Sequence, residues 1–109
     1  MASSLSQPSA GDTTKNSDTR IEIPINAQNP SSTQFYIPRN ATVVAGSQVT
    51  WTNKDTVLHT ATADDGSFDT GLISPGQKAT ITVNGQGTKG YYCLPHPWMK
   101  ATLLVSASS

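Results

Sequence analysis

The folding of this chain is most constrained by a two-residue period of apolar side chains that begins near Arg20. Ile21, Ile23 and Ile25 alternate with polar residues and a proline, and later runs repeat the pattern. Successive side chains of a strand point to opposite faces, so this period is typical of strands with one buried face. No window shows a sustained helical period. The sequence therefore predicts an all-β fold, in which Pro24 marks an edge strand or a bulge.

Turn signals such as Gly46-Ser47 and Asn84-Gly85 separate the short runs. The predicted strands cover residues 21–25, 41–45, 48–52, 57–62, 79–83, 89–94 and 101–105. The thirteen serines and fifteen threonines suit antiparallel sheets with a solvated outer face. Short strands at this spacing favour a β-sandwich of about seven or eight strands.

The first 18 residues differ in composition from the rest of the chain. They hold five serines, two threonines and one large aliphatic side chain, Leu5. Such a stretch cannot bury enough apolar surface to offset its ordering entropy, so residues 1–18 are predicted to be a disordered tail. It lacks the regions of a signal peptide and is either a tether or a cloning remnant. Residues 19–109 then form a single domain.

Charge and composition argue against several classes of protein. Seven basic and seven acidic residues give a net charge of zero, whereas nucleic-acid binding needs a basic surplus. No apolar run reaches the roughly 18 residues that a membrane span needs. The single cysteine, Cys93, excludes an internal disulfide, a zinc ribbon, a thiolate-bridged binuclear copper centre and a cysteine-ligated iron–sulfur cluster.

The residues that carry chemistry gather in two places. Cys93, His96 and Met99 are spaced three residues apart, and the only other histidine, His59, lies 34 residues before the cysteine. One cysteine, two histidines and a weak axial methionine are the ligand set of a type 1 copper site. Thiolate and thioether favour Cu(I), and imidazole serves both oxidation states. The sequence therefore predicts one copper ion bound by these four residues.

Each of these residues alone has a structural explanation, as a buried cysteine, a hydrogen-bonded histidine or a core methionine. Their combined spacing favours the copper site. Zinc is a weaker candidate because Met99 is a poor fourth ligand for it. A Cys–His hydrolytic dyad is weaker still, because Cys93 and His96 share one short loop.

Several further landmarks accompany the ligand spacing. They are Phe35, Pro38, Gly46-x-x-Val49-x-Trp51-x-Asn53-x-Asp55-x-x-x-His59, Phe68-Asp69-Thr70-Gly71, Pro75-Gly76 and Gly90-Tyr91-Tyr92-Cys93. With them, the chain from about Ile21 to Val105 resembles the cupredoxins, the small blue copper proteins of the plastocyanin and amicyanin group. The resemblance implies a Greek-key sandwich, with His59, Cys93 and His96 as strong in-plane ligands and Met99 as the long axial one. It also implies that the Thr60 N–H donates a hydrogen bond to the Cys93 sulfur.

The chain departs from the family pattern at four positions. Leu58 and Thr60 stand where members usually have proline and asparagine, and Leu94 replaces a polar residue. The family's side-chain latch between the two ligand segments is therefore missing, and a looser or apolar contact between Thr60 and Leu94 is expected to replace it. Ala101 stands where many members have glycine, which requires a negative φ there.

The resemblance implies a non-enzymatic one-electron carrier that cycles between Cu(I) and Cu(II). Redox protein partners would dock transiently near His96, over Leu58, Pro97 and Trp98, and Trp98 would be a docking aromatic or a lid. The alternative is a single-copper redox enzyme that acts on a small molecule, such as a nitrogen oxide, at an open copper position. We expect the protein to be a monomer and to work outside the cytoplasm, in the periplasm or at the cell surface.

Overall fold

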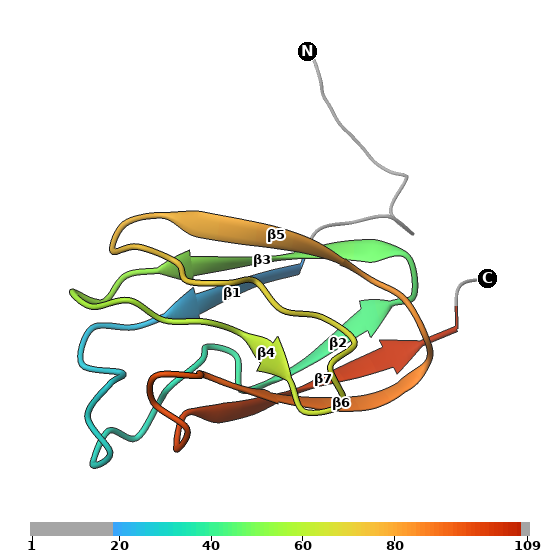
Figure 1. Cartoon of the computed structure of the whole chain (residues 1–109). Coiled ribbons are helices and arrows are strands. Elements are labelled where there is room, and N and C mark those ends of the chain that lie inside the picture. Colours follow the sequence, from blue (N-terminus) through green and yellow to red (C-terminus); the bar gives the residue numbers. More distant parts are fainter. Residues whose placement is uncertain (1–18, 108–109) are drawn as a thin grey trace.

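Seven strands form two facing sheets in the computed structural model, which describes residues 19–107 (Figure 1). The strands are β1 (Thr19–Ile23), β2 (Asn40–Val44), β3 (Ser47–Asn53), β4 (Thr62–Ala63), β5 (Lys78–Val83), β6 (Gly87–Tyr92) and β7 (Lys100–Ser106). One sheet has the order β1-β3-β5 and the other β2-β7-β6-β4. The predicted all-β sandwich is confirmed. The predicted tail, residues 1–18, lies outside the described residues.

The sheets are mixed rather than purely antiparallel as the composition suggested. β1 pairs with β3 and β2 pairs with β7 in parallel, while β3–β5, β4–β6 and β6–β7 are antiparallel. Parallel neighbours require long connections, and the long segment between β1 and β2 crosses from one sheet to the other. The amino-acid composition indicates a solvated outer sheet face, but it carries no information on whether neighbouring strands run parallel or antiparallel.

The core lies between the sheets and follows the predicted alternation. In β7, for example, Ala101, Leu103 and Val105 are buried, whereas Leu104 is half exposed. Trp51 of β3 is fully buried. Its ring packs on Phe68 and meets Tyr91 edge-on, with centroids 5.6 and 5.5 Å apart. This aromatic cluster joins the two sheets behind the ligand-bearing end.

Three predicted strands end earlier or begin later than expected, and one of them, β6, ends at Tyr92 instead of at residue 94. β1 is an edge strand that stops at Ile23, because Pro24 cannot continue the hydrogen-bond ladder, and Ile25 is 64% exposed. The run predicted over residues 57–62 forms only an isolated bridge, His59 to Ile73, before the two-residue strand β4. All three corrections fall where the chain leaves the sandwich to build a loop.

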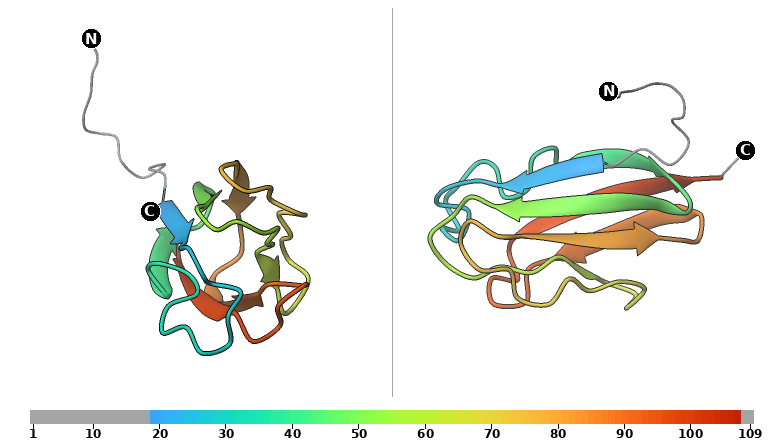
Figure 2. Two further views of the ribbon diagram at one scale, coloured as in Figure 1. Left: turned by 90° about the vertical axis from the view of Figure 1, so that its left-hand side faces the viewer. Right: turned by 90° about the horizontal axis from the view of Figure 1, so that it is seen from above.

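The sandwich has two ends with different roles. The β3–β4 connection and the β6–β7 loop, which carry the predicted ligands, meet at one end (Figure 2). The start of β1 and the end of β7 lie at the opposite end (Figure 2). Among residues 19–107, no helix is long and apolar enough to span a membrane.

Neighbouring leucines of β7 provide a matched test of this packing. Leu103 is fully buried and Leu104 is 50% exposed. Leu103→Ala is expected to lower the free energy of unfolding by about 2–5 kcal/mol, because it leaves a cavity between the sheets. Leu104→Ala should change it by about 0.5 kcal/mol or less. Urea unfolding of the metal-free protein measures both, and equal losses would contradict the assigned faces of β7.

Candidate metal centre

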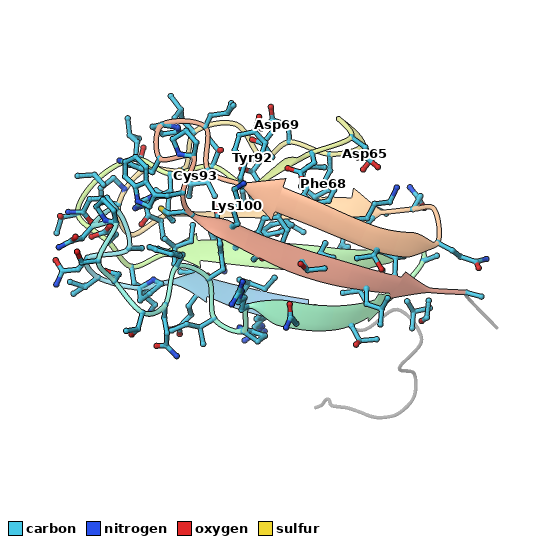
Figure 3. All side chains as sticks on the ribbon, turned by 90° about the horizontal axis from the view of Figure 1, so that it is seen from below. Asp65, Phe68, Asp69, Tyr92, Cys93 and Lys100 are labelled. Carbon is cyan, nitrogen blue, oxygen red and sulfur yellow. The ribbon has the colours of Figure 1, made fainter. Side chains whose placement is uncertain are left out.

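Two segments supply the predicted ligands. His59 lies on the β3–β4 connection, where its backbone N–H donates to the Ile73 carbonyl (3.3 Å) and its carbonyl accepts from the Ile73 N–H (2.7 Å). Cys93 directly follows β6, and Figure 3 shows it near Lys100, which begins β7. His96 and Met99 lie in the loop between these two strands. Sheet ladders therefore fix the ends of both segments.

Three backbone hydrogen bonds close the β6–β7 loop on itself, and each joins two predicted ligands. The His96 N–H donates to the Cys93 carbonyl (3.2 Å), and the Met99 N–H donates to the His96 carbonyl (2.9 Å). The Cys93 N–H donates to the Met99 carbonyl (3.1 Å) and completes the ring. Pro95 and Pro97 restrict φ on both sides of His96. The loop thus holds its side chains by local bonds alone.

The structure brings the donor atoms of His59, Cys93 and His96 together. The Cys93 sulfur lies 3.5 Å from His59 Nδ1 and 3.4 Å from His96 Nδ1. The three atoms lie within 4.8 Å of one another. His59 and Cys93 are fully buried, and His96 is partly exposed. One soft sulfur and two imidazole nitrogens around one point can bind a single metal ion.

A buried carboxylate lies behind His59. Asp55 Oδ2 is 2.8 Å from His59 Nε2, and both side chains are almost completely buried. The carboxylate also accepts N–H bonds from Asn26 (3.0 Å), Gln28 (3.3 Å) and Thr56 (2.8 Å). Because the carboxylate accepts from Nε2, the lone pair of His59 Nδ1 is free to face Cys93. Asp55 therefore fixes both the tautomer and the orientation of this ring.

The pKa values of these groups are shifted as metal binding requires. Burial raises the pKa of Asp55, but hydrogen bonds from His59, Thr56, Asn26 and Gln28 outweigh it, so the pKa lies below its usual value. Burial, and then the nearby His59, lowers the pKa of His96 and favours the neutral, metal-binding ring.

The chemistry of the donor set fits copper. Burial raises the pKa of Cys93 despite the Thr60 N–H, so a thiolate at this position calls for a cation beside it. A single thiolate with two imidazoles, and no carboxylate facing the same point, suits copper better than a hard cation.

Thr60 links the two ligand segments by two hydrogen bonds and also binds Tyr36 of the β1–β2 connection. Its N–H donates to the Cys93 sulfur (3.5 Å), as the resemblance implied. Its carbonyl accepts from the buried Tyr36 hydroxyl. Its Oγ1 accepts from the Leu94 N–H (2.9 Å) and lies 3.0 Å from Thr62 Oγ1. The expected loose or apolar contact between Thr60 and Leu94 is therefore wrong, because the backbone of Leu94 supplies the polar group that its side chain lacks.

Met99 is fully buried directly before β7. Ala101 lies within that strand, opposite Tyr91, and its φ is not among the positive ones. Alanine is thus accommodated where many family members have glycine, and the backbone after Met99 enters the sheet without strain.

Trp98 is not a core residue. Its side chain is 41% exposed, and its ring meets the His96 ring edge-on with centroids 5.5 Å apart. Its Nε1–H donates to the Gln28 carbonyl (3.1 Å). The Gln28 N–H binds Asp55, which holds the His59 ring, and the Gln28 carbonyl binds Trp98, which lies against the His96 ring. The turn at residues 26–28 therefore contacts a neighbour of each histidine. Asn26, the one non-glycine residue with a positive φ (71°) among residues 19–107, begins this turn.

Comparison with known proteins identifies the family of this chain. Residues 24–106 match the copper-binding proteins of the plastocyanin/azurin family. The chain belongs to this family of copper proteins. The cluster of His59, Cys93, His96 and Met99 is typical of a type 1 copper site, and the cofactor is copper.

Individual relatives are identical to this chain at about a third of the aligned positions. Amicyanin-alpha of Methylorubrum extorquens is 32% identical over 68 residues, which cover 58% of this chain and 57% of the relative. Plastocyanin of Scenedesmus fuscus is 30% identical over 88 residues, or 69% and 90% of the two chains. The chain thus spans little more than half the length of the amicyanins that it matches.

Solved structures share the fold. A "novel purple cupredoxin" from Nitrosopumilus maritimus superposes with a TM-score of 0.75 at 30% identity, covering 82% of this chain and all of the other. A structure of an amicyanin variant superposes with a TM-score of 0.66 at 20% identity, over 82% of each chain. The predicted cupredoxin sandwich is confirmed by this likeness.

Sequence reasoning assigned Asp55 no role beyond that of a family landmark. Its spacing of four residues before His59 was a usable signal, since an acidic side chain near a ligand histidine commonly orients the ring. For the turn at residues 26–28, the sequence contains no comparable signal. Its contacts are backbone groups that approach Asp55 and Trp98 only in the folded chain.

Asp55→Asn tests the support behind His59. The two carboxylate oxygens of Asp55 accept four N–H bonds, whereas an amide has only one acceptor oxygen. The His59 ring should therefore lose its fixed orientation. We expect the copper affinity to fall about ten- to a hundredfold, measured for Cu(I) by competition with a chromophoric chelator. Asp65→Asn is the control, because Asp65 is exposed and pairs with Lys89 away from the ligands. Unchanged affinity in Asp55→Asn would refute the positioning role.

Thr60→Val tests the bond between the ligand segments. Valine keeps the shape and both backbone bonds but leaves the Leu94 N–H without its acceptor. We expect the metal-free protein to lose about 1–3 kcal/mol of stability in urea unfolding. Thr60→Ser keeps the oxygen and should lose less. A valine variant as stable as the wild type would show that the bond contributes nothing.

Proposed function

We propose that this protein is a one-electron carrier, in which His59, Cys93, His96 and Met99 would hold a copper ion. The observation that carries the proposal is the difference between the two histidines. His59 is fully buried against Asp55, whereas His96 reaches the surface within an apolar rim. An electron can therefore enter and leave by one route, through the His96 edge.

The rim consists of Leu58, Leu94 and Trp98, which are 42%, 49% and 41% exposed, together with the exposed Pro95 and Pro97. Large apolar groups are rarely exposed together without a binding role. A chain of zero net charge has little long-range attraction for partners, so the rim is the natural contact for brief encounters.

Copper in such a site supplies one-electron chemistry, between Cu(I) and Cu(II). The hydrogen bonds of the protein would restrain the ligands in both states. Asp55 holds the His59 ring, the hydrogen-bonded loop holds Cys93 and His96, and the Thr60 N–H stabilises charge on the sulfur. Because the ligands would move little, the reorganisation energy of each electron transfer would be low.

A single-copper enzyme for a small molecule would need an open position on the metal. The full burial of Met99 and the absence of any further histidine in the chain favour the carrier. The proposal includes an extracytoplasmic location and redox protein partners, and both rest on the family resemblance.

Leu58→Lys tests the route through the rim. In electron self-exchange two copies meet rim to rim, so a lysine on each face opposes contact. We expect the self-exchange rate, measured by NMR line broadening in partly oxidised protein, to fall about tenfold or more at low salt. Leu104→Lys places the same charge on the outer face of β7 and should leave the rate close to wild type.

The visible spectrum provides the accompanying check. Cu(II) added to the metal-free protein should give an intense thiolate-to-copper band, lost on reduction and restored on oxidation. Azide should leave the band unchanged. A colourless protein would refute the site, and a band shifted by azide would favour the open enzyme site instead.

A further inference from the structure

A hollow of about 280 Å³ adjoins the rim. Residues 33–39 form one wall, and Trp98 and Lys100 form the other. Trp98 therefore both contacts the His96 ring and lines this hollow. The hollow is continuous with the surface through which the proposed electron transfer takes place.

The charges that line this hollow have one sign. Arg39 and Lys100 are both exposed, and no acidic side chain lines the hollow. Within residues 19–107 the two ion pairs are Asp55 with His59 and Asp65 with Lys89, so neither Arg39 nor Lys100 has an ionic partner. In a chain of zero net charge, this is a local positive site beside the electron route.

The backbone brings Arg39 and Lys100 near each other. The Arg39 carbonyl accepts from the Thr102 N–H (2.9 Å), next to the first residue pair of β2 and β7. Lys100 is two residues earlier in the same strand, and Figure 3 shows it near Cys93. Phe35 and the buried Tyr36 supply an apolar wall to the hollow.

We propose that this hollow binds an acidic side chain or short acidic segment on the docking face of the redox partner, while the rim binds its apolar surface. The proposal rests on the proposed electron-carrier function. A volume of 280 Å³ is at or below the lower end of small-molecule pockets, so it suits one or two side chains rather than a cofactor. Two cations beside an apolar contact would orient an acidic partner and raise its association rate.

Charged oxidants test the proposal on the copper-loaded, reduced full chain. The protein gives one electron to hexacyanoferrate(III), which becomes hexacyanoferrate(II), or to tris(phenanthroline)cobalt(III), which becomes the cobalt(II) complex. Stopped-flow gives both second-order rates as functions of ionic strength. Arg39→Gln, Lys100→Gln and the double variant are compared, after their reduction potentials have been measured to correct for driving force.

The double variant should react about tenfold more slowly with the anionic oxidant at low salt, and no more slowly with the cationic one. Arg20→Gln with Lys78→Gln removes two cations from the outer face of the other sheet and should have little effect. An unchanged anion rate, or an equal loss with both oxidants, would overturn the proposal. If neither oxidant takes an electron from the wild type, the carrier function itself fails.

A competition experiment identifies the occupant. Hexaglutamate peptide should slow the hexacyanoferrate reaction of the wild type but not that of the double variant, and free glutamate at equal carboxylate concentration should have a much smaller effect. Equal inhibition by free glutamate would make the hollow a small-anion site and overturn the assignment to a partner segment.

Discussion

The hydrogen bond between the buried Asp55 carboxylate and His59 Nε2 is the interaction on which the metal end depends. Charged groups are costly to bury unless they are fully hydrogen-bonded, and this carboxylate accepts from the backbone of Asn26, Gln28 and Thr56 as well. The long connection between β1 and β2 is thereby tied to the segment that follows β3. The same turn receives the Trp98 indole, so one carboxylate organises the surroundings of both histidines.

The sequence was informative where chemistry depends on residue type and spacing. The alternation of apolar residues predicted the sandwich, and the spacing of Cys93, His96 and Met99, with His59 upstream, predicted the copper site. These signals work because few other residues in the chain can bind a soft metal. The periodicity also located four of the seven strands to within one residue at each end, since a strand with one buried face shows in its own residues.

Features that depend on the folded backbone could not be predicted. The parallel pairing of β1 with β3 and of β2 with β7 is set by the path of the connections. The Leu94 N–H replaces a missing side-chain donor, and every residue except proline has such a group, so the sequence gives no sign of it. The hollow beside Trp98 combines segments some 60 residues apart, and its charge appears only when β2 and β7 pair.

The arrangement of the two ends of the sandwich has a practical consequence. The described chain enters at the start of β1 and leaves at the end of β7, both at the end farthest from the ligand loop (Figure 2). If a linker at either position attached the protein to an electrode or to another domain, His96 would face away from the point of attachment. Immobilisation through these positions would therefore expose the same face on every molecule, without altering a residue of the metal end.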